Sequence, residues 1–325
     1  MKRGAATILA LCAFLFGSIL VFSATETAMM LEWFENQTHI IFSVAEEMGF
    51  YDEEGLDMTI MSPGMDSAAP IRSLLAGQVQ IAYTEPSYFV DMILAGHDLV
   101  AFGAFLHSVP HVWYGFAETC AWESPADFAG LRIRDFRDFP QGMWLLKVLD
   151  MFGVDPDEDV TFVGGQPGIT PLEDGAVDVT EGYIVNEPYA VVAAGHDVGY
   201  IHAGSLMDAY GGLLIATREQ IEEDPDTYHA FMRANVKAAQ FVVENPEAAA
   251  EAVTRRVPDL TYDEVYNSLL LMLDTVYLNP DSGVVGDYEI SAERLQDTVR
   301  WLYFIGYLDE IIDVDEHIVY GFEGR

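Results

Sequence analysis

Two glutamates occupy matching places in the sequence, and both could hydrogen-bond a ligand. Glu85 and Glu187 each follow a short β-type segment and each precede a proline that begins an apolar helix. A carboxylate at such a place can accept hydrogen bonds from an exocyclic amine, but it also interacts favourably with the helix dipole. The pattern therefore predicts either a ligand contact or a helix-stabilising acid at both positions.

Aromatic and polar side chains near other expected strand and helix ends extend this candidate site. Trp33 follows the first expected strand and could stack on a planar heterocycle, or it could be a core residue. Asn36 and His39 could offer donors and acceptors to a ligand, or could only cap or pack against the next helix. The other candidate ligand contacts are Asp66, Ser67, Glu181, Tyr183 and Tyr210.

These further candidates have different chemical grounds. Asp66 and Ser67 lie in a turn before a helix, where unpaired backbone N–H groups can hold acceptor atoms. Glu181 competes with Glu187 as the carboxylate of the second half of the site. Tyr183 and Tyr210 could close the other face of a ligand ring, or could be surface aromatics.

The sequence does not predict a metal site or catalytic residues. His107 and His111 are four residues apart, but Pro110 prevents them from sharing one helix face. The glycine-rich residues 164–168 lack the Lys-Ser/Thr ending of a phosphate-binding loop, so any ATP hydrolysis would belong to a partner subunit. We expect no cofactor.

A repeated unit positions the two glutamates. Residues 77–97 and 175–196 both run from a glycine turn through a short strand, a Glu-Pro pair and an apolar helix to Ala-Gly-His-Asp, before another apolar strand. Proline suits the first helical turn and glycine suits the residue after a helix. Each copy therefore predicts strand, helix and strand with the strands parallel, and two such copies predict two α/β lobes that face a ligand-binding cleft.

Lobe boundaries follow from the order of these patterns along the chain. We predict a first part of lobe 1 over residues 25–117 and lobe 2 over residues 118–210. Residues 211–325 are expected to hold a return strand and the C-terminal helices of lobe 1. A chain that leaves one lobe and returns to it makes two crossings, which form a hinge.

Residues 1–24 resemble an export signal. Lys2 and Arg3 precede an uncharged apolar run that ends near small residues, which is typical of a cleaved signal peptide. The run is also nearly long enough to span a bilayer, so an uncleaved membrane anchor is the alternative. Either reading predicts an exported protein, periplasmic or extracellular, with possible membrane attachment through this segment.

The charge of the chain is extreme. Lys and Arg total 15 against 53 Asp and Glu, for a formal net charge of −38. Self-repulsion of this size destabilises a compact chain at low salt, whereas molar salt screens charges over about 3 Å. The composition predicts a halophilic protein, and the scarcity of clustered Lys and Arg argues against nucleic-acid binding.

Several motifs carry a family resemblance over nearly the whole chain beyond residue 24. Residues 31–34 (LEWF), 45–57 (AEEMGFYDEEGLD), 124–133 (SPADFAGLRI) and 292–308 are similar to segments of type 2 periplasmic binding proteins that serve ABC importers. The resemblance implies an α/β fold with two lobes, each a mostly parallel sheet flanked by helices, joined by a two-strand hinge. It also implies an ABC permease and its ATPase subunit as partners.

The spacing from Trp33 to His39 resembles the branch that binds pyrimidine precursors of thiamine. The resemblance implies a small aromatic nitrogen heterocycle as the ligand, bound by hinge closure. Sulfonate, nitrate-like and flavin ligands remain alternatives within the same group. An anionic sulfonate would favour an arginine or a nest of N–H groups, whereas the candidates here are acidic and aromatic.

The same branch contains a pyrimidine-forming synthase that uses pyridoxal phosphate and consumes its own histidine. By this resemblance its cofactor lysine would fall at Thr84, its consumed histidine near Tyr88, and its cysteine-rich iron-binding run near residues 210–216. None of these residue types is present here. The resemblance therefore favours a binding protein over an enzyme, with the synthase as the alternative from another class.

Overall fold

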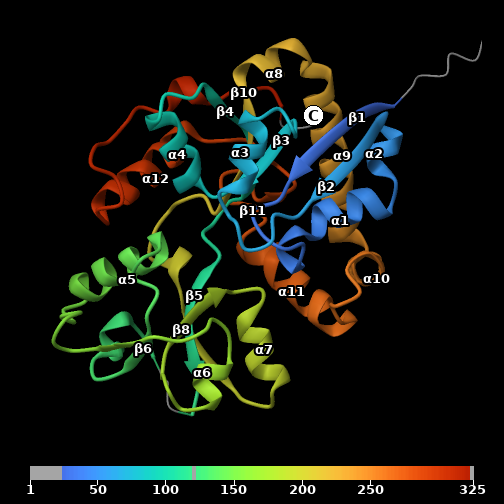
Figure 1. The fold of residues 1–325 in the computed structure, drawn as a ribbon. Helices are drawn as coiled ribbons and strands as arrows, with labels where there is room; N and C mark the ends of the chain where they lie inside the picture. Colours follow the sequence, from blue (N-terminus) through green and yellow to red (C-terminus); the bar gives the residue numbers. More distant parts are fainter. Residues whose placement is uncertain (1–23, 119–121, 323–325) are drawn as a thin grey trace, which may run out of the picture.

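The computed structural model describes residues 24–118 and 122–322, which form two lobes (Figure 1). Each lobe has a β-sheet flanked by helices, and both chain crossings between the lobes lie at the junction of the two. The segment expected to be a leader lies outside the described residues, apart from Ala24. Within the described residues, no helix combines the length and the apolar character needed to cross a membrane.

Lobe 1 contains a five-stranded sheet in the order β2-β1-β3-β10-β4. Its strands are β1 (Thr25–Met30), β2 (Leu56–Met61), β3 (Ile81–Thr84), β4 (Leu99–Leu106) and β10 (Gly212–Thr217). β1 pairs in parallel with β2 and β3, whereas β10 is antiparallel to both of its neighbours. β4 is buried along its whole length, as expected for an apolar strand covered on both faces.

Lobe 2 repeats this arrangement with shorter strands. Its strands are β5 (His111–Phe116), β6 (Arg132–Arg134), β7 (Thr161–Val163), β8 (Thr180–Tyr183) and β9 (Val198–His202). β5 lies between β8 and β9 and is antiparallel to both, and β6 pairs in parallel with β7. A parallel bridge from Ile133 to Val179 joins the two parts into the order β7-β6-β8-β5-β9, which matches lobe 1 strand for strand.

The two copies of the repeated unit become β3-α4-β4 and β8-α7-β9, where α4 is Pro86–Leu94 and α7 is Glu187–Ala193. The strands of each copy are parallel, as the sequence predicts, but they are not neighbours. In each lobe an antiparallel strand contributed from outside the unit separates them, namely β10 in lobe 1 and β5 in lobe 2.

The position of β5 corrects the lobe boundary expected at residue 118. We placed residues 111–116 at the end of the first part of lobe 1, but all six residues of this strand belong to the second sheet. The first crossing is therefore residues 107–110, immediately after β4. The return crossing, residues 206–211, leads into β10, and β10 pairs within lobe 1 as the predicted return strand should.

The remaining helices cover the sheets. Before the first crossing these are η1 (Gln37–His39), α1 (Ile40–Glu47), α2 (Phe50–Glu53) and α3 (Ala69–Leu75), and in lobe 2 they are η2 (Pro125–Phe128), α5 (Pro140–Met151), α6 (Thr170–Glu173) and η3 (Ala203–Ser205). After β10 the elements are α8 (Arg218–Glu223), α9 (Pro225–Glu244), α10 (Pro246–Arg256), α11 (Tyr262–Thr275), β11 (Leu278–Asn279), β12 (Val284–Val285), α12 (Ala292–Phe304) and η4 (Asp315–His317). α9 and α10 pack on α1, and α12 packs on α4.

Local sequence explains where these helices begin. Pro86, Pro225 and Pro246 are the first residues of α4, α9 and α10, where the missing N–H is not needed and the fixed φ angle suits the helix. α11 begins with a capping box, in which Thr261 and Glu264 each accept from the other's backbone N–H.

The two crossings lie against each other and form the hinge. The Gly211 N–H donates to the Leu106 carbonyl oxygen at 2.9 Å. A Cβ atom added to Gly211 would lie 2.4 Å from the Ser108 carbonyl oxygen, so only glycine permits this approach.

An arginine from α12 fastens both crossings. The Arg294 Nη2 donates to the His107 carbonyl oxygen at 2.6 Å, and its Nε donates to the Asp208 carboxylate at 2.7 Å. Its guanidinium group also stacks over the Tyr210 ring, 4.6 Å from the ring centroid. This largely buried side chain therefore ties both crossings to α12 of lobe 1.

Nearly all basic side chains of the described residues form ion pairs. Each described arginine forms an ion pair with an Asp or Glu side chain, and Lys237 pairs with two glutamates of α2 and its C-terminal end. Since acids outnumber bases by more than three to one, most carboxylates have no cationic partner. Their mutual repulsion is screened only by the solvent and its dissolved ions.

Candidate functional site

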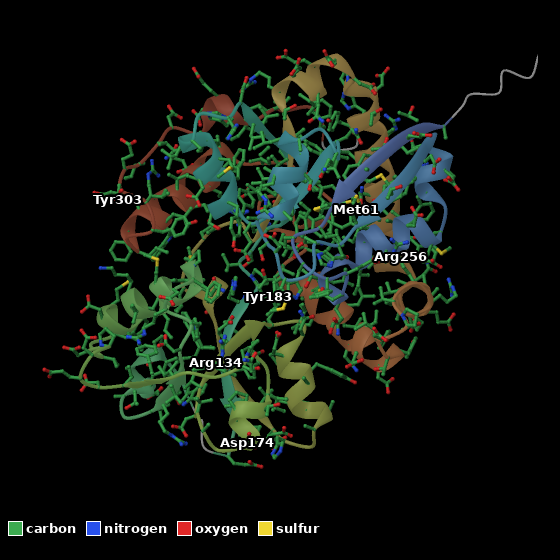
Figure 2. All side chains as sticks on the ribbon, viewed as in Figure 1. Met61, Arg134, Asp174, Tyr183, Arg256 and Tyr303 are labelled. Carbon is green, nitrogen blue, oxygen red and sulfur yellow. The ribbon has the colours of Figure 1, made fainter. Side chains whose placement is uncertain are left out.

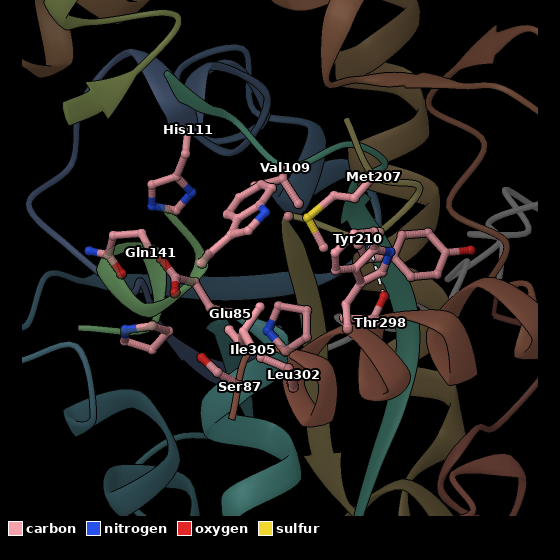
Figure 3. Close-up of a pocket in the computed structure, with 16 residues that line it drawn as sticks. Glu85, Ser87, Val109, His111, Gln141, Met207, Tyr210, Thr298, Leu302 and Ile305 are labelled. Carbon is pink, nitrogen blue, oxygen red and sulfur yellow. Dashed lines mark hydrogen bonds between the residues drawn. The ribbon is translucent and has the colours of Figure 1, made fainter. Parts of the chain in front are cut away.

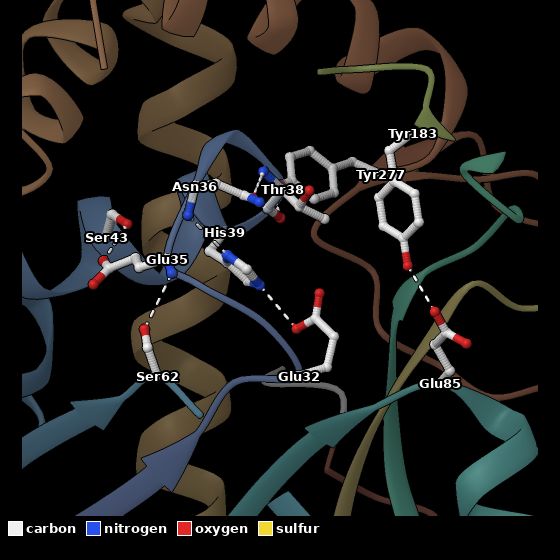
Figure 4. Close-up of polar contacts among 10 residues, drawn as sticks. All are labelled: Glu32, Glu35, Asn36, Thr38, His39, Ser43, Ser62, Glu85, Tyr183 and Tyr277. Carbon is white, nitrogen blue, oxygen red and sulfur yellow. Dashed lines mark hydrogen bonds and ion pairs between the residues drawn. The ribbon is translucent and has the colours of Figure 1, made fainter. Parts of the chain in front are cut away.

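A hydrogen bond between the lobes marks the centre of the candidate site. Glu85 directly follows β3 of lobe 1 and is the N-cap residue of α4, and Tyr183 is the last residue of β8 in lobe 2. The Tyr183 hydroxyl donates to Glu85 Oε1 at 2.8 Å (Figure 4). Figure 2 shows Tyr183 in the space between the two lobes. The structure thus brings together two residues that the sequence predicts separately. Through this bond the two lobes are in direct contact.

Burial of this contact shifts the proton affinity of the carboxyl group. Burial raises the pKa of Glu85 to about 7, the Tyr183 hydrogen bond opposes that shift, and the nearby Glu32 carboxylate adds to it. A second carboxylate of lobe 1 therefore lies close to Glu85. With its pKa raised into the neutral range, the Glu85 carboxyl group can donate a hydrogen bond when it is protonated and accept one when it is ionised.

Glu32 is held in place by His39. The Asn36 N–H donates to His39 Nδ1 at 3.1 Å, which leaves the ring proton on Nε2, and Nε2 lies 2.8 Å from Glu32 Oε2. His39 is fully buried. The sequence left open whether His39 offers a ring nitrogen to a ligand or only caps and packs, and in the structure both nitrogens are bonded within the protein. The structure instead makes His39 a residue that positions Glu32.

Asn36 has a structural role as well. Its side-chain oxygen accepts from the Thr38 N–H at 2.8 Å and caps η1. This oxygen therefore has the helix-capping role that the sequence left open as the alternative to a ligand contact.

The loop that carries Trp33 is held in place by two contacts of Glu35. The Glu35 N–H donates to Ser62 Oγ at 3.1 Å, and the Glu35 carboxylate pairs with Arg256. Trp33 itself is 36% exposed and meets Phe34 edge-on at 5.8 Å between ring centroids. Trp33 is therefore a partly exposed aromatic on a fixed loop, with surface left for a ring to stack on.

The predicted turn before α3 lies next to α4. Asp66 forms an exposed ion pair with Arg72 of α3. Ser67 hydrogen-bonds to Tyr88 on α4, and burial together with the Glu85 charge raises the pKa of that tyrosine. The turn therefore adjoins the Glu85 side of the site, but its acid is already paired.

The two acids of lobe 2 are bonded differently. Glu181 pairs with Arg134 at 2.6 Å, and both side chains are largely buried. The Glu187 Oε2 accepts the Tyr183 N–H at 2.6 Å, and burial raises the pKa of Glu187 to about 7. A Cβ atom on Gly182 would lie 2.5 Å from the Glu187 carboxyl group, so a larger residue there would displace the Glu187 side chain. Glu187 thus fixes the strand end that presents Tyr183.

A pocket of about 80 Å³ lies beside Glu85, which is one of the residues that line it (Figure 3). It is lined by α4 and α12 of lobe 1, by α5 of lobe 2 and by both crossings, so closure of the lobes forms its walls. Its lining is mainly apolar and includes Trp144 and Trp301. No lysine or arginine is among the residues that line it.

Tyr210 borders this pocket, and the sequence left open whether its ring stacks on a ligand or lies on the surface; in the structure the side chain is buried. Its hydroxyl accepts from the Ser291 N–H at 2.8 Å, and the side chain is buried beneath Arg294. The structure therefore assigns Tyr210 to the hinge, where one face of its ring is already occupied by the guanidinium group.

His111 connects the pocket with the bond between the lobes. It begins β5, directly opposite Tyr183 in the sheet, and the two rings meet edge-on at 4.7 Å between centroids. Burial lowers the pKa of His111 to about 4, so its imidazole is neutral at physiological pH.

Sequence reasoning missed Glu32, Ser87, His111 and Trp144 as site residues. Glu85 and Glu187 could be found from their matching places in the repeated unit. Trp144 could not, because it lies within an apolar helix and has the sequence pattern of a core residue. His111 was considered only as a metal ligand, paired with His107. Among the described residues no group of three His, Cys, Asp or Glu side chains is arranged to hold a metal ion.

A protein-family model described as "NMT1/THI5 like" matches residues 36–249, more than half of the chain. Among curated proteins, the formylaminopyrimidine-binding protein of Halalkalibacterium halodurans is 29% identical over 306 residues, which cover 90% of this chain and 89% of that protein. A 4-amino-5-hydroxymethyl-2-methylpyrimidine phosphate synthase of Legionella pneumophila is 20% identical and covers 79% of this chain and 83% of its own length.

Solved structures share the fold. The periplasmic aliphatic sulphonate binding protein SsuA from Escherichia coli superimposes with a TM-score of 0.70 at 15% sequence identity, over 91% of this chain and 98% of that one. At this identity the likeness concerns the fold alone, and it confirms the two-lobed periplasmic binding protein architecture that the sequence predicts.

Proposed function

This chain belongs to the NMT1/THI5-like family, and from that membership and the chemistry of its cleft we propose that it is an exported solute-binding protein of an ABC importer. In this proposal its ligand is a small aromatic nitrogen heterocycle that carries an amine, of the thiamine pyrimidine-precursor class. The ligand binds between the lobes and holds them closed. An ABC permease and its ATPase subunit then receive it.

The observation that carries the ligand class is the acidic and aromatic wall of lobe 1. Glu32 and Glu85 approach the same space, and Trp33 offers a partly exposed ring on the same lobe. An exocyclic amine donates to carboxylates, and a planar ring gains from stacking on an indole. A sulfonate would meet two carboxylates there, and Arg134 is already paired with Glu181.

Two further lines support binding without catalysis. The named relative with the higher identity is a binding protein. Thr84 and Tyr88 also occupy the positions where the synthase resemblance requires a cofactor lysine and a reactive histidine. Addition of pyridoxal phosphate and iron should give neither a Schiff-base absorbance nor a pyrimidine product, and detection of either would revive the enzyme alternative.

The proposal includes export through residues 1–24, with cleavage or with retention as an anchor. The apolar run behind two basic residues supports it. Mass spectrometry of the protein purified from its own host would give the mature N-terminus. A chain that begins at Met1 in the soluble fraction would contradict both forms of this part of the proposal.

The ligand class is tested by calorimetry with 4-amino-5-hydroxymethyl-2-methylpyrimidine and with an alkyl sulfonate. Trp33→Ala should weaken pyrimidine binding by about 1–3 kcal/mol through loss of stacking. Above pH 7, where Glu85 is ionised, Glu85→Gln should weaken it by up to about 3 kcal/mol, since the charged acceptor is replaced by a neutral amide. Tyr303→Ala, an exposed aromatic substitution on α12, is the matched control and should change nothing.

Tighter binding of the sulfonate by the wild-type protein, with Trp33→Ala neutral for both compounds, would refute the pyrimidine assignment. The two-lobed receptor would stand in that case, because its architecture rests on the sheets and the hinge and not on the ligand.

A further inference from the structure

Besides the bond between Tyr183 and Glu85, the lobes meet where α11 of lobe 1 packs on α7 of lobe 2 (Figure 1). The Ser268 hydroxyl of α11 donates to the Val185 carbonyl oxygen, which belongs to the turn of residues 184–186 between β8 and α7. Ser268 and Val185 are each 1% exposed. The bond is therefore shielded from water, where a hydrogen bond is stronger and the loss of one partner costs more.

The Ser268 hydroxyl is used differently from another hydroxyl on the same helix. Thr275 donates to the Leu271 carbonyl oxygen, four residues earlier, as hydroxyl groups within helices commonly do. Ser268 lies on the buried face of α11, and its hydroxyl bonds to the other lobe. This hydroxyl therefore contributes to the contact between the lobes and not to its own helix.

Apolar side chains surround the bond between Ser268 and the turn. Ile184 belongs to the same buried cluster as Leu269 and Met272 of α11. Tyr189 of α7 forms a further hydrogen bond with Thr261, the N-cap residue of α11. Apolar contact is not directional, so it holds two surfaces together without fixing one position. A hydrogen bond is directional, and the one from Ser268 selects one position of the turn against the helix.

The helix α11 is also connected to the other wall of the ligand site. It contacts η1 of lobe 1. The Tyr277 hydroxyl, two residues beyond the end of α11, donates to the Thr38 carbonyl oxygen of η1 at 2.9 Å (Figure 4). In lobe 2 the turn that α11 contacts lies directly between Tyr183 and Glu187. One helix of lobe 1 therefore joins both walls of the cleft.

We propose that Ser268 is a positioning residue of the ligand site: through the Val185 carbonyl oxygen, it sets where the turn of residues 184–186 lies when the lobes close. Tyr183 and Glu187 flank this turn and are positioned with it. The inference rests on the proposed function, since both side chains belong to the cleft in which the ligand binds. Ser268 acts through the turn and not by contact with the ligand.

The test removes the hydroxyl and measures closure and affinity separately. Ser268→Ala deletes the donor and leaves the Val185 carbonyl oxygen without this partner in the closed form. Small-angle X-ray scattering of the ligand-free protein should show a larger radius of gyration than for the wild type. Calorimetry with 4-amino-5-hydroxymethyl-2-methylpyrimidine should show an affinity reduced at least about fivefold. The factor should be similar at pH 6 and pH 8.5, because neither a serine hydroxyl nor a backbone carbonyl group titrates between them.

Thr275→Val is the matched control. It removes a hydroxyl from the same helix but breaks only a bond within that helix, so it should match the wild type in both measurements. If Ser268→Ala lowers the melting temperature but leaves the radius of gyration and the affinity equal to those of Thr275→Val, Ser268 only stabilises the fold and the inference is overturned.

The inference and the proposed function can fail separately, because the scattering measurement needs no ligand. A wild-type protein that binds no pyrimidine, with Ser268→Ala still expanded, would overturn the proposed function while the role of Ser268 in closure stands. A wild-type protein that binds the pyrimidine, with Ser268→Ala unchanged in both measurements, would overturn the inference and leave the proposed function in place.

Discussion

Removal of the Tyr183 hydroxyl should loosen the contact between the lobes by an amount that depends on pH. Tyr183→Phe deletes the 2.8 Å hydrogen bond to Glu85 and leaves the ring in place. A bond of this kind contributes about 0.5–1.5 kcal/mol when the acceptor is neutral and about 1.5–3 kcal/mol when it is charged. Since the pKa of Glu85 lies at about 7, the carboxyl group passes from mostly neutral at pH 6 to mostly ionised at pH 8.5.

The effect on closure follows from these values. At pH 6 the closed arrangement should lose about 1 kcal/mol, and at pH 8.5 about 2 kcal/mol, which correspond to roughly fivefold and thirtyfold changes in the ratio of closed to open molecules. A ligand that binds only the closed form should lose affinity by up to the same factors, and by less if the closed form is already well populated without ligand. Because the tyrosine stabilises the ionised carboxyl group, its removal should also raise the pKa of Glu85 above 7.

Two measurements check this prediction. Small-angle X-ray scattering of the ligand-free protein should show a larger radius of gyration for Tyr183→Phe, with a larger difference at pH 8.5. Calorimetry with 4-amino-5-hydroxymethyl-2-methylpyrimidine should show the corresponding loss of affinity. Tyr303→Phe, on the exposed surface of α12, should match the wild type in both. A loss of affinity that is equal at the two pH values, or larger at pH 6, would contradict the assignment of Glu85 as the titrating partner.

The remaining predictions concern stability. The melting temperature should rise by at least several degrees as KCl increases from 0.1 to 2 M, because unpaired carboxylates repel one another; a flat profile in calorimetric scans would contradict the halophilic interpretation. The raised pKa of Glu85 means that its contribution to stability is complete below pH 4.5 and is lost as the pH rises through about 7. Glu85→Gln should therefore gain up to about 3 kcal/mol over the wild type between pH 4.5 and 8 in urea unfolding, unlike Glu222→Gln on the exposed surface of α8. Arg294→Met should lower the free energy of unfolding by about 1.5–3 kcal/mol, since the charged hydrogen bond to the His107 carbonyl oxygen is buried; a change below about 0.5 kcal/mol would show that the two crossings do not depend on this arginine.

The repeated pattern allowed the two lobes to be predicted, but not the order of their strands. Residues 77–97 and 175–196 contain the local signals for strand, helix and strand, because proline and glycine act within a few residues. Which strand lies beside which depends on packing between distant segments. No local signal marks β5 and β10 as the strands that separate the two members of each repeat, and this is why β5 was assigned to the wrong lobe.

The candidate site was predictable as a set of residue types but not as a network of bonds. Glu85 was identified by its position between an expected strand and an expected helix, and Tyr183 as an aromatic next to the candidate acid Glu181; the structure brings the two together. Both ring nitrogens of His39 are hydrogen-bonded within lobe 1, one to the Asn36 N–H and the other to Glu32. The spacing of residues in the sequence determines neither the tautomer of the ring nor its contact with Glu32. Trp144 was hidden because a tryptophan in an apolar helix has the same pattern whether it faces a core or a pocket.

The late arrival of β10 sets an order of assembly. All five strands of lobe 2 lie between residues 111 and 202, whereas lobe 1 needs residues 212–217 to fill the space between β3 and β4. Until that segment has been synthesised, both of those strands carry an unpaired edge that can pair with another chain. A chain that ends before residue 212 can therefore complete only its second lobe. The lobe whose strands are made first is the lobe that is finished last, and during export both of its open edges need protection for the longest time.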